Sequence, residues 1–329
     1  MKYSKQNDLI PKKEVSGFEL VEPPRGHRQY VKRGQLLQHV AKGQSFDDII
    51  DTAQHQFGIN EFVVGFSGGK DSGVVLDKMV KKGLITKVLH LDTKTGVQVT
   101  QDFVIEQCKN YNLKLNIRTP PPFPYIFAAI VLSHGFSGPF MHKMFLKYLK
   151  YKTIQKFLAE PQFKGKKVAI VTGVRKFESQ SRMGRYEHPI TQDGQMWQVM
   201  PIFYESQSSV YQYYINNNLK RSEAYDYTNN SLDCGCGSYA HRTDAEAIEH
   251  LDSNRAKYFK WLEYGIIHFG SQQAKKYSKW GGIGMTEREA QHTLLDVLEE
   301  EDESTWKAIE RFVCGEECGA GTMKGMTDF

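Results

Sequence analysis

The feature that most constrains the fold is the stretch between residues 61 and 80. An apolar run, Phe62 to Gly65, leads directly into a loop of small and polar residues at 67–72, and an apolar-periodic segment begins at Val74. Short β-branched runs are typical of buried strands, whereas apolar residues spaced three or four apart are typical of amphipathic helices. The stretch therefore predicts a strand at 61–66, a loop, and a helix at 72–82.

Strand and helix patterns continue to alternate along the chain. Further strands are expected at 86–91, 113–117 and 167–172. Further helices are expected at 46–57, where Ser45 is the predicted N-cap, at 99–111 and at 140–159. Near-continuous apolar strands that alternate with helices predict an α/β fold, in which helices cover both faces of a parallel twisted sheet.

The pattern becomes mainly helical after about residue 205, with helices expected at 206–219, 243–263 and 286–299. We therefore expect three parts: an N-terminal arm at 1–45, an α/β domain at 46–205 that contains the loop, and a helical C-terminal region at 206–329 that carries a cysteine cluster.

Composition excludes some classes of protein. The longest strongly apolar run, Tyr125 to Leu132, is much shorter than the roughly 20 residues that a membrane span needs. The first residues lack the apolar core of a signal peptide, so we expect a cytoplasmic protein with no membrane partner. The formal net charge of +5 suits anionic ligands such as nucleotides or nucleic acid.

The loop after the first strand has the chemistry of an anion site that also takes a metal ion. Two glycines allow close approach of a ligand to the backbone, and the start of the following helix favours an anion. Lys70 adds a positive charge, whereas Asp71 would repel an anion unless a cation such as Mg²⁺ binds with it. A Walker A loop is excluded, because that pattern needs glycine where Val64 stands and Ser or Thr where Asp71 stands.

Four stretches together resemble one known family. Ser67 to Ser72 matches the pyrophosphate-binding loop SGGxDS, or PP-loop, of the ATP pyrophosphatase superfamily. His90 to Thr100 is similar to the family's second-strand motif, with Lys94-Thr95 inserted, and 172–182 resembles its motif of glycine followed by two arginines. Val199 to Ile202 is like the family's Pro-Ile segment. The resemblance covers about residues 60–240 and is to the phosphoadenosine-phosphosulfate (PAPS) reductase-like branch, whose fold is adenine nucleotide alpha-hydrolase-like.

The resemblance implies a set of site residues. The residues implied in nucleotide binding are Ser67, Gly68, Gly69, Lys70, Asp71, Ser72, Asp92 and Gly173; the residues implied in catalysis are Lys70, Asp71, Arg175 and Arg182. Arginine binds phosphate or sulfate with two parallel hydrogen bonds, which suits Arg175 and Arg182 to this role. Asp92 ends the second strand, where it would reach a ribose or a metal, or would act as a turn residue.

The five cysteines suggest a second site. Cys234 and Cys236 lie close together, as do Cys314 and Cys318, whereas Cys108 falls in an apolar-periodic helix and is expected in the core. Four thiolates fit zinc or a 4Fe-4S cluster. Cluster-bearing relatives also place four cysteines in this region, usually with another spacing. Free buried thiols and a redox pair are the alternatives, and Cys318 in Glu-Cys-Gly is also similar to the nucleophile of sulfonucleotide reductases.

The intact loop favours ATP as the substrate. The resemblance implies that the loop holds the pyrophosphate of Mg²⁺-bound ATP while an acceptor attacks the α-phosphate and becomes adenylated. The similarity is greatest to ATP pyrophosphatases of DNA phosphorothioation. It implies a 4Fe-4S cluster (or zinc), a DNA or RNA partner, a sulfur donor such as a cysteine desulfurase, and a homo-oligomer or complex. The basic and aromatic residues at 275–282 would track a nucleic-acid backbone and stack a base, or form an ordinary surface loop.

Two other functions remain open from the sequence. The first is a phosphoadenylyl-sulfate or adenylyl-sulfate reductase that uses a C-terminal cysteine. The second is a non-catalytic nucleotide-binding subunit of a larger complex.

Overall fold

The computed structural model describes residues 44–85, 87–121, 127–136, 142–176, 188–238, 240 and 242–281, together with two short paired strands, β1 (Glu14–Val15) and β2 (Phe18–Glu19). Several sequence predictions lie outside these residues: most of the N-terminal arm, Arg182, the helix at 286–299, Cys314 and Cys318.

Contacts divide the chain into two compact units that are interleaved along the sequence. Unit 1 comprises Met1–His90, Asp102–Ile117 and Gln155–Ser231, and unit 2 comprises Leu91–Gln101, Arg118–Ile154 and Leu232–Phe329. Each unit is therefore built from several segments, and the contiguous boundaries expected at 45 and 205 stay a prediction.

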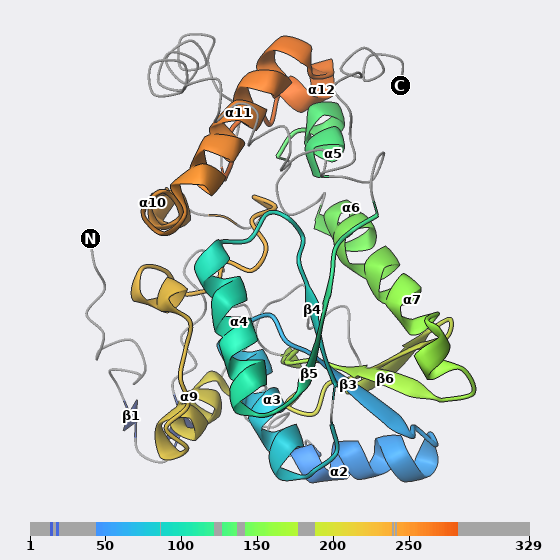
Figure 1. The fold of residues 1–329 in the computed structure, drawn as a ribbon. Coiled ribbons are helices and arrows are strands. Elements are labelled where there is room, and N and C mark those ends of the chain that lie inside the picture. The colour runs from blue at the N-terminus through green and yellow to red at the C-terminus, as the bar shows by residue number, and fades with distance from the viewer. Residues whose placement is uncertain are drawn as a thin grey trace. The chain divides into compact units, whose positions relative to one another are not determined.

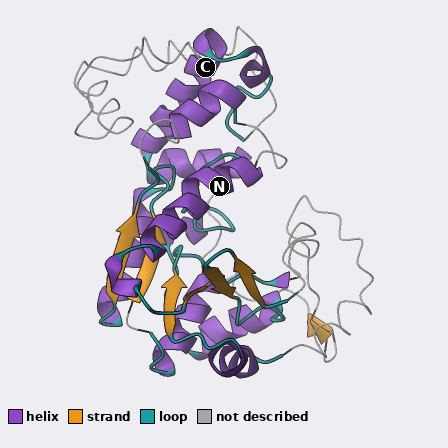
Figure 2. Cartoon of the chain, turned by 90° about the vertical axis from the view of Figure 1, so that its right-hand side faces the viewer, coloured by secondary structure: helices purple, strands orange, loops and turns teal. Residues whose placement is uncertain are grey.

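One six-stranded sheet forms the centre of unit 1, with the order β5-β4-β3-β6-β8-β7 (Figure 1). Its strands are β3 (Glu61–Gly65), β4 (Lys87–Leu91), β5 (Lys114–Arg118), β6 (Val168–Val171), β7 (Ile190–Asp193) and β8 (Met196–Val199). The pairs β3–β4, β3–β6 and β6–β8 are parallel, whereas β7 pairs with β8 in the antiparallel direction. Helices flank this sheet (Figure 2), so the predicted α/β class is confirmed.

The central strands are buried because both of their faces are covered. Val63 and Val64 of β3 and all four residues of β6 are buried, which is the pattern of a parallel strand inside an α/β protein. The hairpin of β7 and β8 was not predicted, because its outer strand is polar. Its two-residue loop contains Gly194 at φ 59°, which is the backbone conformation that tight hairpin turns require.

Most predicted helices are confirmed. They are α2 (Phe46–Asp51), continued by the π-helix η1 (Thr52–Gln56), α3 (Lys70–Lys81), α4 (Gln98–Asn110) and α9 (Gln207–Asn216). The helix expected at 140–159 is α6 (His142–Phe145), the π-helix η3 (Leu146–Tyr151) and α7 (Lys152–Leu158). Four short or apolar elements were not predicted: α5 (Phe127–His134), α12 (Gln272–Lys275) and the 3₁₀ helices η4 (Pro161–Phe163) and η6 (Glu223–Asp226).

The single helix expected at 243–263 is wrong. The chain forms α10 (Arg242–Leu251) and α11 (Ser253–Phe269), and the break lies at Asp252. The Asp252 carboxylate accepts a hydrogen bond from the backbone N–H of Arg255 at 2.9 Å, so it caps a new helix instead of continuing the old one.

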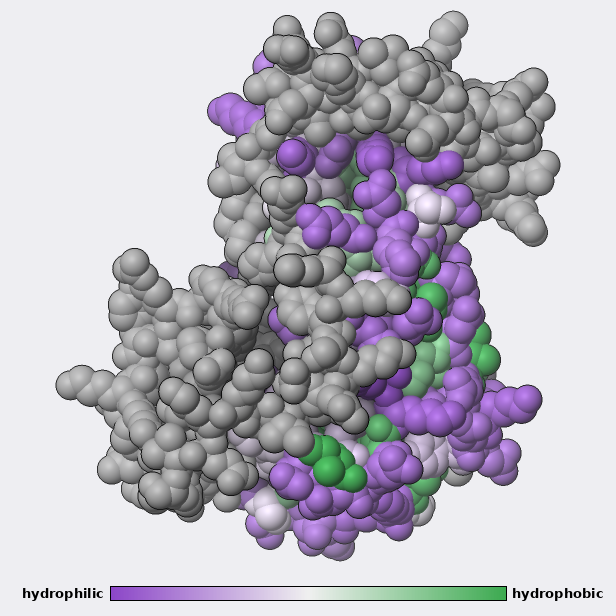
Figure 3. Space-filling view, turned by 90° about the vertical axis from the view of Figure 1, so that its left-hand side faces the viewer, coloured by the Kyte–Doolittle hydropathy of each residue, from purple (hydrophilic) through white to green (hydrophobic). Residues whose placement is uncertain are grey.

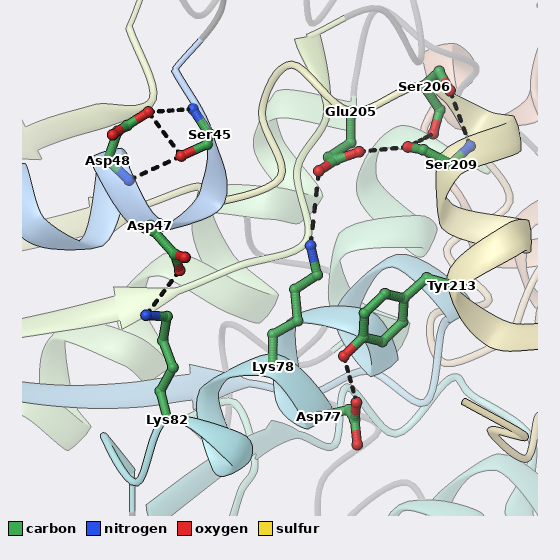
Figure 4. Close-up of polar contacts among 10 residues, drawn as sticks. All are labelled: Ser45, Asp47, Asp48, Asp77, Lys78, Lys82, Glu205, Ser206, Ser209 and Tyr213. Atoms are coloured by element: carbon green, nitrogen blue, oxygen red, sulfur yellow. Dashed lines mark hydrogen bonds and ion pairs between the residues drawn. The ribbon is translucent and has the colours of Figure 1, made fainter. Parts of the chain in front are cut away.

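Polar contacts join the helices of unit 1 at their surfaces (Figure 4). Ser45 is the N-cap of α2, as predicted, and exchanges hydrogen bonds with Asp48. Lys82, the C-cap of α3, pairs with Asp47 at 2.8 Å, and Tyr213 of α9 donates to Asp77 of α3 at 2.6 Å. These contacts fix α3, the helix that follows the loop, between two neighbours.

The described surface on the face in Figure 3 is mostly hydrophilic, with apolar residues in small patches. Among the described helices, none has both the length and the hydropathy that crossing a membrane demands. Cys108 is buried in the core of unit 1, as predicted, and burial raises the pKa of its thiol to about 12.

Candidate functional site

The loop at 67–72 lies where the order of the sheet reverses. After β3 the chain passes through α3 to β4 on one side, whereas β6 lies on the other side of β3. In open α/β sheets, ligands bind outside the carboxyl ends of the strands at such a point. The loops that follow β3 and β6 are therefore the two that should meet there.

The loop presents the start of α3 with its N–H groups directed outward. Gly69 is the N-cap and has no side chain with which to cap the helix. The hydroxyls of Ser67 and Ser72 hold the turn itself: Gly69 N–H donates to Ser67 Oγ at 3.3 Å, and Ser72 Oγ donates to the Gly69 carbonyl at 2.9 Å. Gly68 has φ 73°, where a side chain would be strained. The positive end of the α3 dipole favours an anion at this place.

Lys70, the first residue of α3, has its ammonium between two tyrosine rings. Its Nζ lies 5.7 Å from the ring centre of Tyr211 and 5.6 Å from that of Tyr225. Within the described part of the chain, Lys70 Nζ has no hydrogen bond and no ion pair. Burial favours the neutral amine, but Tyr225, Asp71 and Tyr211 outweigh it and raise the pKa of Lys70. A charged ammonium without a counter-ion at a helix start is suited to an anionic ligand.

Tyr225 also touches the loop backbone. Its hydroxyl accepts a hydrogen bond from the backbone N–H of Lys70 at 3.0 Å, across 155 residues of sequence. Burial raises the pKa of the Tyr225 phenol, so this hydroxyl stays protonated at neutral pH. The neutral Tyr225 hydroxyl therefore already accepts a hydrogen bond from the Lys70 N–H, which a bound anion would otherwise use.

A small cavity adjoins this cluster. Its volume is about 20 Å³, and its lining is Lys70, Tyr211, Tyr214, Arg221, Tyr225, Thr228 and Asn229. Such a volume holds about one water molecule. Arg221 brings a second cationic group to the cavity and pairs with Asp226 at 3.1 Å. The cluster therefore offers positive charge and aromatic surface beside the loop.

The loop after β6 contacts the loop after β3, as the topology requires. Arg175 is 3% exposed, and its Nε donates to Asp71 Oδ1 at 2.8 Å. A Cβ atom on Gly173 would lie 2.5 Å from Asp71 C and Ser72 N, so only glycine fits there. Arg175, expected as a phosphate ligand, is thus seen holding Asp71.

Asp92, in unit 2, is engaged locally. Its carboxylate accepts the backbone N–H of Lys94 at 2.9 Å and pairs with the Lys94 ammonium at 2.8 Å. Lys94 has φ 59°, so Asp92 stabilises the turn that the inserted residues form. This is the turn function that the sequence left open for Asp92, and a role with ribose or metal stays a prediction.

Cys234 and Cys236, also in unit 2, form a turn that is shaped by the inserted Thr95. The Thr95 hydroxyl accepts the N–H of Gly235 at 3.0 Å and lies 4.0 Å from Cys234 Sγ. A Cβ on Gly235 would overlap the Thr95 carbonyl and the Phe259 ring. Both cysteines are free thiols. The two sulfurs are therefore held side by side by a turn that only glycine permits.

The electrostatics of this pair favour one thiolate. A hydrogen bond from Cys236 and the nearby Lys150 lower the pKa of Cys234 to about 6, although burial opposes them. The same hydrogen bond, together with burial, raises the pKa of Cys236. Lys150 pairs with Asp233 at 3.4 Å and keeps a positive charge at the turn. These properties fit half of a four-thiolate set. Across the described residues no three metal-ligating side chains cluster, and Cys314 and Cys318 lie outside them.

Of the two possibilities that the sequence left open for residues 275–282, base stacking by Trp280 is excluded by the burial of its ring. Trp280 is 7% exposed, its Nε1 donates to the Gly235 carbonyl at 2.8 Å, and its ring stacks on Phe259 with centroids 5.0 Å apart. It supports the cysteine turn from within unit 2 and is not available to a base.

The structure thus brings the loop residues together with Gly173 and Arg175. Three residues of these sites were not predicted from the sequence: Tyr225, Thr95 and Lys150. The inserted position of Thr95 was a usable signal, whereas nothing local to Tyr225 or Lys150 marks them.

Comparison with known families agrees with this geometry. A family model, that of the phosphoadenosine phosphosulfate reductase domain, matches residues 61–239. The chain belongs to this family. The predicted resemblance is confirmed, and the chain is a member of a PP-loop nucleotide-binding family, whereas the phosphorothioation branch stays a prediction. Comparison with curated proteins finds no match.

Several solved structures are similar at low identity. The phosphoadenylyl-sulfate reductase of Candida auris, a phosphate complex, is 16% identical with a TM-score of 0.41, over 61% of this chain and 94% of that one. The FMN adenylyltransferase of Candida glabrata with FMN and an ATP analogue is 16% identical with a TM-score of 0.40, over 59% and 62%. Yeast FAD synthetase in complex with FAD is 13% identical with a TM-score of 0.33, over 67% and 82%.

Proposed function

We propose that this protein is a PP-loop ATP pyrophosphatase that cleaves ATP between the α and β phosphates and adenylates an acceptor. The observation that carries the proposal is the Lys70 ammonium, which has no counter-ion in the described structure and lies at the open start of α3. A departing pyrophosphate supplies the missing negative charge.

In the proposed reaction an acceptor oxygen attacks the α-phosphorus, and the bond to the bridging oxygen of the β-phosphate breaks. Lys70 and the N–H groups at the start of α3 stabilise the charge that develops on the pyrophosphate. Arg175 holds Asp71 in place through its hydrogen bond. Bound Mg²⁺ would neutralise phosphate charge, with Asp71 as its protein ligand and the phosphates and water as the others.

We further propose that the acceptor belongs to sulfur incorporation into nucleic acid, as in DNA phosphorothioation. The outer sulfur of a persulfide donor, such as a cysteine desulfurase, would attack the adenylated phosphate and displace AMP. A second thiol would then cleave the remaining sulfur–sulfur bond, forming a disulfide with the donor and leaving sulfur on the phosphate. Cys234, Cys236, Cys314 and Cys318 would hold a 4Fe-4S cluster, or alternatively zinc. The support for this part is the cysteine turn beside Lys150, which compensates the negative charge of thiolates.

Calorimetric titration tests the nucleotide site directly. The wild-type protein should bind Mg²⁺ with a non-hydrolysable ATP analogue, and inorganic pyrophosphate should compete. The Lys70→Met variant should lose at least about tenfold in affinity, because one charge-assisted contact is worth about 1.5–3 kcal/mol. Lys82→Met is the matched control, since Lys82 lies in the turn that ends α3 and pairs with Asp47. Absence of binding, or equal loss in the control, would refute the site.

The family description supports one other function, reduction of PAPS. In this alternative the substrate would be PAPS or adenylyl sulfate, and Cys318 would be the nucleophile. Product analysis separates the two: the proposed reaction releases pyrophosphate from ATP, whereas the reductase releases sulfite from the sulfonucleotide. If nucleotide binds and neither product forms with any acceptor, and Lys70→Met leaves cellular activity intact, the chain is a non-catalytic subunit.

Metal analysis after anaerobic purification tests the cysteine set. We expect iron with a broad visible absorption band, and its loss in Cys234→Ser and in Cys236→Ser. Cys108→Ser is the control, because Cys108 lies in the core of unit 1. A colourless protein that contains zinc would indicate a structural zinc site instead of an iron–sulfur cluster. Metal that persists in both variants would show that Cys234 and Cys236 are not its ligands.

A further inference from the structure

Basic residues are concentrated in one part of the chain. Residues 107–159 contain eight Lys or Arg and no Asp or Glu. This charge exceeds the formal +5 of the whole chain, so the rest of the chain is net acidic. Such asymmetry is a physical signal for an anionic partner. Within the segment, the lysines gather on the continuous helical stretch formed by α6, η3 and α7 (Figure 1).

This helical stretch has one apolar face and one basic face. Phe145 and Leu149 are buried, and the Phe145 ring packs on Phe127 with centroids 5.6 Å apart. Lys143 and Lys147, one helical turn apart, are exposed, and in the described part of the chain neither has an acidic partner. The apolar side is thus occupied by the core of unit 2, and the charged side faces solvent.

The π-helical turn places a third lysine on the same side. In an ordinary α-helix, five residues would put Lys152 about 140° around the axis from Lys147. A π turn winds less per residue and reduces this separation. The observed contacts agree, because the ammonium groups of Lys147 and Lys152 lie 5.3 Å and 5.0 Å from the centre of the same ring, that of Tyr148. Two like charges therefore converge on one side chain.

We propose that Lys143, Lys147, Lys152 and Tyr148 form a surface that binds the phosphate backbone of a nucleic-acid duplex. Three ammonium groups along about 14 Å of helix match a run of phosphates, and such contacts are independent of sequence. The inference deepens the proposed function by naming where its acceptor docks. The same turn carries Lys150, which points instead to Asp233 beside Cys234, so the surface and the cysteine turn belong to one unit.

An anionic membrane is the other polyanion that a basic helix could bind. A helix that binds a membrane inserts its apolar face between lipids. Here that face is already buried, so insertion would require the core of unit 2 to open. The duplex needs only the ammonium groups on the basic face, of which Lys143 and Lys147 are exposed and Lys152 is half-buried.

The test is the salt dependence of binding to a fluorescently labelled DNA duplex, measured without ATP between about 50 and 200 mM salt. Each phosphate contact contributes roughly −0.9 to the slope of log affinity against log salt. The variant K143Q/K147Q/K152Q should lose at least about tenfold in affinity, and its slope should be shallower by about 2 to 3. The control K109Q/K164Q/K220Q removes the same charge from exposed lysines of unit 1 and should change little.

A cooperative thermal unfolding transition and retained nucleotide binding at the Lys70 site would show that each lysine variant is folded. If the triple variant unfolds, K147Q alone should still make the slope shallower by about one. An equal loss of duplex affinity in the control variant would overturn the proposed surface, as would wild-type protein that does not bind the duplex. Lysine-dependent binding to phosphatidylserine vesicles, without binding to the duplex, would also overturn it. Because Lys70→Met should leave duplex binding unchanged, failure of this surface is distinct from failure of the nucleotide site.

Discussion

At Gly173 the contact between the two loops depends on a missing side chain. The loop after β6 reaches the first turn of α3 only because backbone atoms approach to a distance that a Cβ would not allow. This close approach also positions Arg175 to hold Asp71. Gly65, at the end of β3, provides a comparison, since a Cβ there would meet its nearest neighbour at an ordinary 3.5 Å.

Gly173→Ala should therefore displace the PP-loop. We expect a loss of about 1–3 kcal/mol in the free energy of unfolding, as for overpacking, together with weaker pyrophosphate binding. Gly65→Ala should retain both properties. Urea unfolding and calorimetry measure the two quantities, and a Gly173→Ala protein with wild-type stability and affinity would contradict the packing argument.

Glu263 is a buried carboxyl whose only described hydrogen bond is the N–H of Trp280, at 2.6 Å. The residue is 8% exposed, and burial raises its pKa to about 7 from an ordinary 4.5. Between these two values the folded protein holds a proton that the unfolded chain has released. Stability must then fall as the pH rises through this window.

The variant Glu263→Gln keeps the acceptor oxygen and removes the titration. The wild-type free energy of unfolding should decline relative to the variant by up to about 1.4 kcal/mol per pH unit between pH 4.5 and about 7. Urea unfolding from about pH 5 to about pH 8 measures this difference. The exposed Glu246→Gln is the control and should follow the wild type. Parallel curves for wild type and Glu263→Gln would show that the carboxyl does not titrate in this window.

At the scale of elements, the break between α10 and α11 depends on one carboxylate. Asp252 accepts the N–H of Arg255 at 2.9 Å with one oxygen and the N–H of Gln98 at 3.2 Å with the other. It thereby starts α11 and also ties the start of α4 to it within unit 2. The sequence around Asp252 favours helix on both sides, which is why a single helix was expected.

Asp252→Ala should lower the free energy of unfolding by about 1–2 kcal/mol, because the cap is lost and Gln98 loses its acceptor. Asp252→Asn should recover most of this loss, since asparagine caps helices nearly as well. Chemical denaturation of the three proteins provides the measurement. If Asp252→Ala were as stable as the wild type, the capping contact would not determine the break.

At the scale of the whole molecule, the two units are interleaved, and unit 1 extends past the boundary expected at 205. Tyr214 of α9 belongs to the core of unit 1, and its hydroxyl lies where a Cβ on Gly73 would stand. Tyr225 supplies the acceptor for Lys70 N–H. The loop is therefore supported by residues that follow the predicted α/β domain.

We expect a fragment of residues 46–205 to lack cooperative unfolding and to bind no pyrophosphate. A fragment of residues 46–231 should recover part of both properties, because it restores α9 and Tyr225. Circular dichroism during urea unfolding and calorimetric titration compare the two. If both fragments unfolded cooperatively and bound pyrophosphate equally well, the α/β domain would not need residues beyond 205.

The sequence by itself determined the strand–loop–helix unit, the α/β class, the family and the pairing of cysteines along the chain. These depend on short-range periodicity and on residue types at fixed spacing, which are visible in one dimension. Tertiary structure alone decided that Arg175 holds Asp71, that Tyr225 caps Lys70, and that Trp280 lies under the cysteine turn. The two partners in each of these contacts are distant in sequence. Their contacts form only when the chain packs, because burial removes water and each buried polar group then needs a hydrogen-bond partner within the protein.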